Sequence, residues 1–502
     1  MLNLGQLLGS GIFSVPGVVL DSVGSVGLSL SLWVISPIFA LGAWHSFDNV
    51  LSTFALLSYT ELASFFPGRS GAEVVFLEHA YPRPRFFVPI TFAISSVLLS
   101  FSASNSIVFA QYTLSFFDLP ITDLSQTVLA VGVATFSAAV VATSTKWALR
   151  AVNALSLFKV LSLVFVAVTG VAVLAGFTRI SDPLANFHNF WQGGTANPNS
   201  LATALIKTNF AYIGWSNAFN VLGEVNGTSP VLTVRNAGFI SLGIVTTLFF
   251  AVNLAYIAAV PLDEIRHSGQ LIGVLFFEHV FSGHWASKIL PILVALSCVG
   301  NITIGQARIF REVARQGLLP YPTFFASTRP FGTPLGPVAL KYAITVLAIS
   351  AIPARDAFNF LLDLGSYPIL VFHAATAIGL WLLRARRASE GLKKSPFQVW
   401  NAVIALWLFQ SVFLLVMPWV PPEDGHADVS FWYATYCVVG IILLLLCALF
   451  YYVWIVLLPK ISGYEIVEEV VDLGGGALTS RLVRKYKIRS PDERPLLSSP
   501  HD

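Results

Sequence analysis

Long apolar stretches recur along almost the whole chain and restrict its fold more than any other feature. Hydrophobic residues make up 55% of the 502 residues and charged residues only 11%, and the mean hydropathy is +0.74. A stretch of about 20 apolar residues crosses the hydrocarbon core of a bilayer as one α-helix. Because lipid offers the backbone no hydrogen-bond partners, α-helices are favoured, since each helix forms its own backbone hydrogen bonds. We therefore predict an all-α polytopic membrane protein.

The sequence predicts twelve transmembrane spans, followed by a polar tail at 459–502. The spans cover 2–20, 27–66, 86–115, 126–145, 154–176, 203–222, 237–260, 286–307, 338–353, 358–383, 399–420 and 431–458. With the N-terminus in the cytoplasm, the predicted outer loops hold only four basic residues, which are Arg179, Arg266, Lys288 and Arg355. This asymmetry follows the positive-inside rule and places both termini in the cytoplasm.

The composition argues against several classes of function. The net charge of +3 reflects basic inner loops, so it indicates no nucleic-acid partner. Cys298, Cys437 and Cys447 all lie in apolar spans, which argues against a disulfide framework and against a thiolate metal site. No span carries a catalytic constellation of His, Asp or Cys, so we expect neither an enzyme nor a bound cofactor.

The second span is too long for one helix and carries Asp48 near its middle. An Asp at the centre of a bilayer costs about 2.5–3.5 kcal/mol. Removing roughly a dozen residues between Gly42 and Leu56 would leave a helix of ordinary length. We therefore predict an insertion here that arises from the gene model or from splicing.

The first span contains a break in its helical pattern. Gly9-Ser10-Gly11 places two glycines around a serine, and Pro16-Gly17 follows. A helix that breaks within a bilayer must line a cavity, where its free N–H groups can bind a carboxylate. The alternative is that Gly5-x-x-x-Gly9 is only a helix-packing face.

The sixth span contains a corresponding break, because Gly214 lies among aromatic and small polar residues. Interrupted helices at corresponding positions of two repeats indicate the binding site of a transporter. The first span would offer N–H groups to a carboxylate, and the sixth would offer carbonyl groups to an ammonium. Together these groups describe an amino acid, although an aromatic cluster taken alone indicates packing.

Four ionisable residues lie within the predicted spans. Lys159 either extends its ammonium toward the bilayer surface or replaces a metal cation beside the first span. Lys207, near the outer end of the sixth span, is predicted to extend to the surface in the same way. Asp363 and His373 are either buried polar partners or members of a proton relay.

Three groups of residues resemble the amino acid–polyamine–organocation transporters. They are Gly9-Ser10-Gly11-Ile12-Phe13, the run Tyr59-Thr60-Glu61-Leu62 with Pro67-x-x-Ser70-Gly71-Ala72-Glu73, and Phe210-Ala211-Tyr212-Ile213-Gly214-Trp215. Within this superfamily, the L-type-like fungal methionine permeases are resembled more closely. That likeness rests on Trp215-Ser216-Asn217-Ala218-Phe219-Asn220, with Phe76-Leu77-Glu78 and Arg83-Pro84-Arg85-Phe86-Phe87.

The resemblance implies a five-plus-five inverted repeat with broken helices 1 and 6 and two C-terminal helices. The transporter domain then covers 1–458, with the first repeat at 1–176, the second at 203–383 and the last two helices at 399–458. The cytoplasmic tail covers 459–502. Two departures from the family pattern are the extra residues in the second span and the start of the chain at the first helix, so we expect an N-terminal tail to be missing.

The resemblance also implies which residues hold the substrate. The carboxylate-binding turn falls on Gly9, Ser10 and Gly11, with Ile12 adjoining. The carbonyls that bind the ammonium fall on Phe210, Ala211 and Ile213, and the Phe210 ring would cover the substrate. Trp215 and Asn217 would face the side-chain pocket. Lys159 falls where several members place a lysine at the sodium site of their sodium-coupled relatives, which favours the cation-replacing interpretation.

The activity implied is proton-coupled transport of neutral, methionine-like amino acids across the plasma membrane by alternating access. The expected partners are an amino acid, a proton and the lipid bilayer. An L-type exchanger or facilitator is the first alternative, since it needs no proton gradient. A non-transporting amino acid sensor on the same fold is the second.

Overall fold

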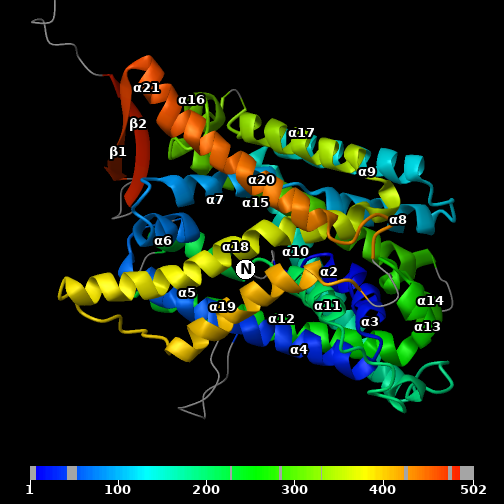
Figure 1. Ribbon diagram of the computed structural model, residues 1–502. Coiled ribbons are helices and arrows are strands. Elements are labelled where there is room, and N and C mark those ends of the chain that lie inside the picture. Colours follow the sequence, from blue (N-terminus) through cyan, green and yellow to red (C-terminus); the bar gives the residue numbers. More distant parts are fainter. Residues whose placement is uncertain are drawn as a thin grey trace, which may run out of the picture.

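The computed structural model describes residues 7–41, 54–69, 71–225, 229–281, 285–329, 331–422, 428–472 and 478–486. These residues form a bundle of long helices with a two-stranded antiparallel hairpin at one end (Figure 1). Within them, eight helices are long and apolar enough to cross a membrane, and shorter apolar helices accompany them. The prediction of a polytopic helical membrane protein is therefore confirmed.

The elements follow the predicted spans in order. The first half of the bundle comprises α2 (Gly11–Ser14), α3 (Pro16–Val23), α4 (Val26–Leu41), α5 (Phe54–Phe65), α7 (Phe87–Leu98), α8 (Ala103–Phe116), α9 (Asp123–Thr143) and α10 (Thr145–Leu174). The second half comprises α11 (Pro198–Ala211), η2 (Trp215–Glu224), α12 (Pro230–Ala259), α15 (Trp285–Arg315), α17 (Leu335–Ala351), α18 (Ala354–Ser389), α19 (Asn401–Val416) and α20 (Thr435–Tyr451). The remaining elements used below are α6 (Ala72–Ala80), α13 (Leu262–His267), α14 (Ile272–Phe281), α16 (Pro322–Ala326), α21 (Leu458–Ser462), β1 (Tyr464–Asp472) and β2 (Leu478–Tyr486).

The predicted breaks in the first and sixth spans are present. Residues 8–10 are non-helical before α2, and a turn over residues 212–214 separates α11 from η2. The second span comprises α4 and α5. The suspected insertion between Gly42 and Leu56 falls mostly on residues 42–53, which lie outside the described part of the chain.

The third span is interrupted as well, where the sequence predicted one continuous helix over 86–115. α7 ends at Leu98 and α8 begins at Ala103. The backbone groups of this break are bound by hydroxyl groups: Ser100 Oγ donates to the Val97 carbonyl at 2.7 Å, and Ser102 N–H donates to Thr345 Oγ1 at 3.2 Å. Side-chain partners of this kind allow a helix to break within a membrane.

The second half of the first span is delimited by a proline and a glycine. Pro16 is the first residue of α3, and Gly24 ends the helix with a φ of +72°. Proline fits the first helical position, whereas the left-handed region favours glycine at the end. A Cβ atom at Gly24 would lie 2.1 Å from the Gly193 carbonyl oxygen, so this glycine also admits the loop that precedes α11.

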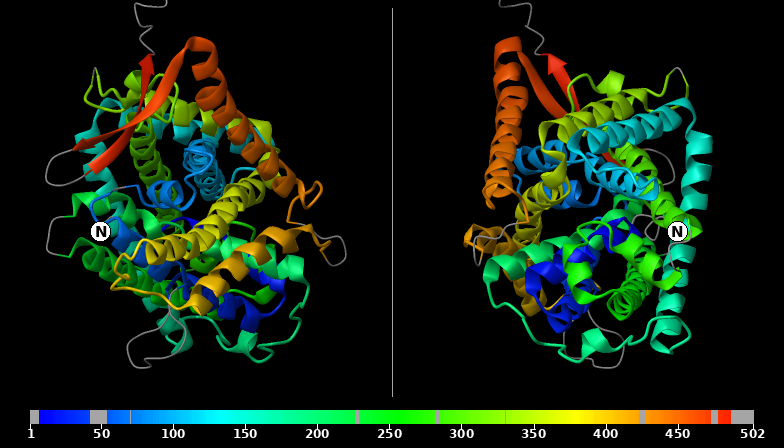
Figure 2. Two further views of the ribbon diagram at one scale, coloured as in Figure 1. Left: turned by 60° about the vertical axis from the view of Figure 1, so that its left-hand side comes forward. Right: turned by 90° about the vertical axis from the view of Figure 1, so that its right-hand side faces the viewer.

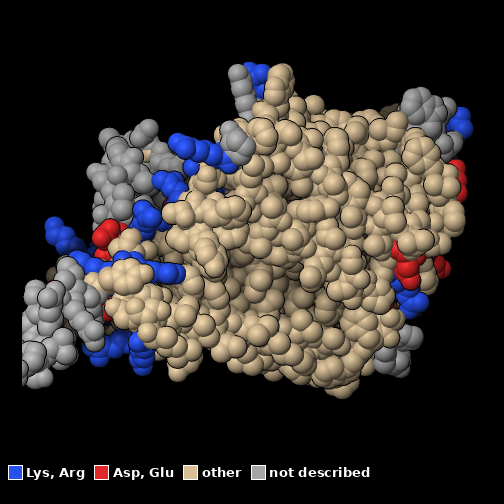
Figure 3. Space-filling model, turned by 90° about the horizontal axis from the view of Figure 1, so that it is seen from above, with Lys and Arg blue, Asp and Glu red and all other residues tan. Residues whose placement is uncertain are grey.

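Charged side chains are concentrated at the ends of the bundle. In Figure 3, Lys and Arg gather mainly at the end that carries the hairpin, and the broad face between the two ends is almost free of charged residues. From Ala154 onward in α10, and along α20, the exposed side chains are apolar, as at Val168 and Leu445, both 63% exposed. Such a band matches the hydrocarbon core of a bilayer. We name the two ends the hairpin end and the opposite end, the latter carrying α13 and α14 (Figure 1).

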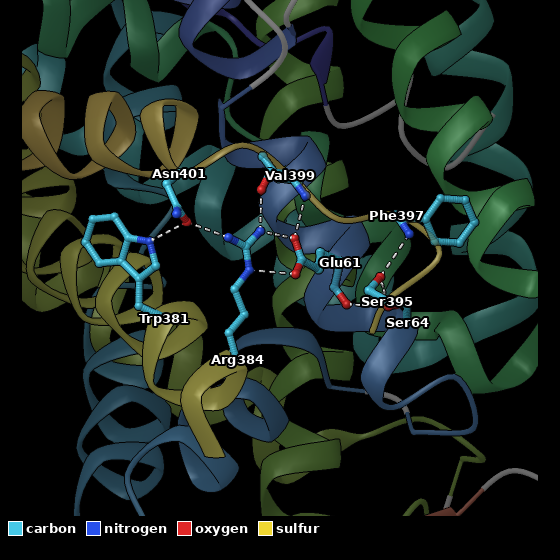
Figure 4. A network of polar contacts seen from close by, with 8 residues as sticks. All are labelled: Glu61, Ser64, Trp381, Arg384, Ser395, Phe397, Val399 and Asn401. Atoms are coloured by element: carbon cyan, nitrogen blue, oxygen red, sulfur yellow. Dashed lines mark hydrogen bonds and ion pairs between the residues drawn. The ribbon is translucent and has the colours of Figure 1, made fainter. Parts of the chain in front are cut away.

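Glu61 and Arg384 form a buried ion pair between α5 and α18 (Figure 4). Arg384 Nε donates to Oε1 of Glu61 at 2.8 Å and Nη2 donates to Oε2 at 2.6 Å, a bidentate geometry. Oε2 also accepts the Val399 N–H at 2.7 Å, and Arg384 Nη1 donates to Asn401 Oδ1 at 2.7 Å. Glu61 is only 1% exposed, whereas the Arg384 side chain is 15% exposed, so the network ties α5, α18 and the start of α19 together around a buried carboxylate.

The hairpin formed by β1 and β2 lies against the end of the bundle, close to α21 (Figure 2). Leu482 N–H of β2 donates to the Gln316 carbonyl, just after α15, at 2.8 Å. The Glu468 carboxylate of β1 lies 3.7 Å from Arg69 and 4.0 Å from Arg85. Part of the predicted tail is therefore docked on the helical domain.

We expect this docking to strengthen as the pH at the hairpin end falls below about 7. Burial, followed by the neighbouring Glu468 carboxylate, raises the pKa of Glu78 in α6 to about 7, against the opposing effect of Arg69. When the hairpin undocks, Glu78 loses its neighbour Glu468 and becomes less buried, so its pKa falls. Docking therefore takes up a proton at Glu78. The pH-dependent stabilisation is thus complete below the undocked pKa and is lost as the pH rises through about 7.

Spin-label distances between exposed positions of β2 and α16, measured at pH 6 and pH 8, test this expectation. The docked population should be larger at pH 6 in the wild type and equal at both pH values in Glu78→Gln. Glu469→Gln, at an exposed position of β1 next to Glu468, serves as the control and should keep the wild-type response. A wild-type population that does not change between the two pH values would contradict this account.

Candidate functional site

The first helix interruption is held in place by α8. Gly9 and Ser10 precede α2, and N–H groups in the first turn of a helix have no preceding helical carbonyl to bind. Ser10 Oγ donates to Oδ1 of Asn105. Tyr112 OH, also on α8, donates to a carbonyl of α2 at 2.6 Å. The start of α2 is therefore fixed. The Phe13 N–H already donates to the Ser10 carbonyl, so the N–H groups ahead of it in this turn are the ones that a carboxylate could bind.

The second interruption is held by α4. α11 ends at Ala211, and the turn that follows passes through Gly214, whose φ of +117° lies in the region that favours glycine. Ser36 Oγ of α4 donates to Oδ1 of Asn209 in the last turn of α11 at 2.6 Å. The carbonyl groups at the end of a helix carry partial negative charge and attract cations. This end of α11 can therefore receive an ammonium group.

The two interruptions touch each other. A Cβ atom added at Gly11 would lie 2.8 Å from Cα and 2.9 Å from Cβ of Ala211. Real Cβ atoms do not approach other atoms so closely, so only glycine lets the start of α2 meet the end of α11. The contact places the N–H groups of one helix end beside the carbonyl groups of the other.

A cavity of about 260 Å³ lies between the two interruptions, α8, α10, α15 and α18. Its lining residues are Gly9, Ser10, Gly11, Leu99, Ser100, Phe101, Ser104, Asn105, Lys159, Phe210, Ala211, Ile213, Gly214, Ser216, Cys298, Asn301, Ile302, Gly305, Gln306, Ile309, Leu361, Leu362, Gly365, Ser366 and Ile369. Among these described residues Lys159 is the one charged side chain, and most of the larger side chains are apolar. The cavity therefore offers polar groups at the helix breaks and an apolar wall elsewhere.

Most of the predicted site residues meet at this cavity: Gly9, Ser10, Gly11, Phe210, Ala211, Ile213 and Lys159 all line it. Ile12 and Trp215 do not. Ile12 is fully buried in the core, and Trp215 packs edge-on against Tyr59 with 4.9 Å between ring centroids. Such aromatic pairing stabilises buried rings, which explains why Trp215 faces α5. The side chain of Asn217 lies outside the described part of the structure.

Sequence reasoning missed the contribution of the third span. Ser100, Phe101, Ser104 and Asn105 all line the cavity, from the break before α8 and from its first turn. The signal was present as a run of small polar residues inside an apolar span, the same signal that identified the first interruption. Asn105 is the most informative of them, because it binds Ser10 directly.

The two lysines within spans differ in their surroundings. Lys159 is 2% exposed, lines the cavity on α10 and interacts with the thiol of Cys298 on α15. Lys207, on α11, is fully buried and pairs with carboxylates. The prediction that Lys207 extends to the bilayer surface is therefore wrong, because its ammonium group forms ion pairs with two carboxylates inside the protein.

Two interrupted helices that meet at a cavity inside a membrane bundle characterise one class of secondary transporters. Comparison with known proteins agrees with this class. The family model described as "Amino acid permease" matches residues 1–447. The chain belongs to this amino acid permease family, which consists of transporters and not of enzymes.

Individual relatives are similar over most of the chain. A high-affinity methionine permease of Saccharomyces cerevisiae is 30% identical over 474 residues, covering 93% of this chain and 79% of the relative. A low-affinity methionine permease of the same organism is 27% identical, covering 97% and 86%. The human cystine/glutamate transporter is 28% identical, covering 82% and 77%. The chain is thus similar to transporters of several amino acids.

Proposed function

We propose that this protein is a secondary active transporter of neutral, methionine-like amino acids that works by alternating access at the plasma membrane. The observation that carries the proposal is the contact between Gly11 and Ala211, which puts helix N–H groups and helix carbonyl groups at one cavity. The first set of groups suits a carboxylate and the second an ammonium. Gly9, Ser10 and Gly11 would bind the carboxylate, and the carbonyls of Phe210, Ala211 and Ile213 the ammonium.

The lining of the cavity favours a neutral, apolar substrate side chain. A cationic side chain would need a carboxylate partner, and the described lining residues include no Asp or Glu. Leu99, Ile302 and Ile369 provide apolar contacts instead. The volume of about 260 Å³ lies just below the usual range for small-molecule pockets, about 300–1,000 Å³, which suits a small substrate.

We further propose twelve spans in two inverted repeats of five and a final pair, with both termini in the cytoplasm and a proton as coupling ion. The concentration of Lys and Arg at the hairpin end supports this orientation (Figure 3). One proton that crosses 100 mV yields about 2.3 kcal/mol. Because about 1.4 kcal/mol corresponds to a tenfold concentration ratio, this energy supports a gradient of neutral amino acid of several tens of fold. Lys159 would take the place of a metal cation beside the first interruption.

Uptake of labelled methionine by cells that lack their own permeases tests the proposal. We expect saturable uptake that neutral amino acids inhibit by competition and that is lost when the proton gradient collapses. Ser10→Trp and Phe210→Ala should each reduce uptake by roughly a hundredfold, because the first fills the cavity and the second removes one of its walls. Phe409→Ala, at an exposed position of α19, is the matched control and should transport normally.

The results distinguish the alternatives. Uptake that survives collapse of the proton gradient, together with efflux that requires an external amino acid, would identify an exchanger. Substrate binding without any flux would identify a sensor. Normal uptake by both site variants would refute the assignment of the site, even if transport itself is confirmed.

A further inference from the structure

Three charged side chains meet between α11, α18 and the segment before α20, and the transport scheme above gives them no role. Lys207 Nζ of α11 lies 2.9 Å from Oδ2 of Asp363 on α18 and 2.8 Å from Oδ2 of Asp428, in the segment before α20. Lys207 Nζ also lies 3.4 Å from the Asn359 carbonyl oxygen, and Asn359 Nδ2 donates to the Asp428 carbonyl at 2.9 Å. We call Lys207, Asp363 and Asp428 the charge triad.

The triad holds two carboxylates and one ammonium. The side chains of Lys207 and Asp363 are 0% and 3% exposed, whereas that of Asp428 is 20% exposed. A buried carboxylate without a balancing cation is costly, and uptake of a proton removes the cost. Oδ1 of Asp363 is buried and has no hydrogen-bond partner among the described residues. The triad therefore contains an oxygen atom that can accept one proton.

Among the described residues around the triad, no second cation is found. On α20, Tyr436 and Cys437 lie within electrostatic reach of Asp363, and Tyr436 also of Asp428. Both are neutral at physiological pH. Asp356 at the start of α18 accepts hydrogen bonds from Ser430 N–H, at 3.0 Å, and from its hydroxyl group. The charged neighbour of Asp356 is the exposed Arg355, whose Nε lies 4.0 Å from Oδ1 of Asp356.

The position of the triad links it to the cavity. Lys207 lies one helical turn before Phe210, which lines the cavity. On α18, Asp363 lies between Leu362 and Gly365, which both line the cavity as well. Asp428 belongs to a different segment, which the triad holds against α11 and α18. A change of charge in the triad therefore acts on elements that must move when access to the cavity alternates.

We propose that the charge triad is the binding site of the proton that is transported with the amino acid; the inference rests on the proposed function above. A proton from water reaches the triad through the partly exposed Asp428 and forms a neutral carboxylic acid at Asp363. The triad then has no net charge, and α11, α18 and the Asp428 segment stay together. Loss of the proton to the cavity restores two carboxylates, whose repulsion separates these elements.

The test compares two activities of the protein reconstituted in liposomes. The first is accumulation of methionine driven by an imposed pH gradient, and the second is exchange of methionine at equal concentrations on both sides. In Asp363→Asn we expect accumulation to fall at least tenfold and to lose its dependence on pH between 5 and 7.5. Exchange should stay within about threefold of wild type, because exchange uses only the proton-loaded form of the carrier, which the neutral Asn imitates, and because the amino acid site is intact.

Two further variants make the outcome decisive. Asp428→Asn should impair accumulation in the same way, since it removes the other carboxylate of the triad. Asp356→Asn is the matched control: it holds the same segment through Ser430 but lies outside the triad, so it should keep both activities. Full pH-driven accumulation in Asp363→Asn, or parallel loss of both activities in a variant that still folds, would overturn the proposal.

The wild type separates this inference from the proposed function. If it exchanges methionine but never accumulates it under a pH gradient, the proton site is refuted while amino acid transport stands. If it neither exchanges nor accumulates any amino acid, both proposals are refuted.

Discussion

Replacing Gly11 with alanine is expected to lower amino acid uptake by roughly a hundredfold while the protein still reaches the membrane. The added Cβ would lie 2.8 Å from Cα of Ala211, so α2 and α11 must separate by a large fraction of an ångström. Both helix ends contribute groups to the same proposed ligand. A displacement of about 1 Å between such groups costs on the order of a hundredfold in rate.

The matched control is Gly132→Ala in α9, where an added Cβ would meet no atom within 4 Å. Both variants make the same chemical change within the bundle, and both are measured by surface labelling and by uptake of labelled methionine. We expect Gly132→Ala to transport like the wild type. Equal uptake by Gly11→Ala and Gly132→Ala would show that close contact between the two interruptions is not needed.

Removing one partner of the Glu61–Arg384 pair is expected to destabilise the protein by about 3–5 kcal/mol. Glu61 is 1% exposed and accepts hydrogen bonds from both Arg384 and the Val399 backbone (Figure 4). Glu61→Gln would leave the arginine charge without a counter-ion, and Arg384→Met would leave a buried carboxylate. Either change places an uncompensated charge in the interior.

Thermal unfolding of detergent-solubilised protein, followed by size-exclusion chromatography, measures this effect. The double variant Glu61→Gln/Arg384→Met should be more stable than either single variant, because it leaves no unpaired charge. Arg315→Gln, which removes an exposed pair with Glu312, should change stability by only about 0.3–0.5 kcal/mol. Single variants as stable as the wild type would contradict a structural role for the buried pair.

The helix interruptions in spans one and six could be predicted because their signal is local. Glycine and proline inside an apolar run oppose a continuous helix whatever the rest of the fold is. The breaks at Gly9-Ser10-Gly11 and Gly214 could therefore be predicted from a single sequence. The same kind of signal in Ser100–Ser106 went unused, which is why the role of Asn105 emerged only from its hydrogen bond to Ser10.

The buried ion pairs could not be predicted from the sequence, because their partners lie far apart along the chain. Glu61 and Arg384 are 323 positions apart, and Lys207 and Asp363 are 156 positions apart. Hydropathy treats each of these residues as a lone charge in or near a span, for which extension to the bilayer surface is the ordinary expectation. Only the packing of distant helices shows that Lys207 has two carboxylate neighbours.

The sequence by itself determined that the chain is a polytopic helical membrane protein and where the first and sixth spans break, because hydropathy and backbone preference act over about one span at a time. The tertiary structure decided that the two breaks touch at Gly11 and Ala211, that Trp215 packs against Tyr59, and that Lys207 pairs with two carboxylates. These features depend on which distant faces meet, and that choice is made by the packing of the whole bundle.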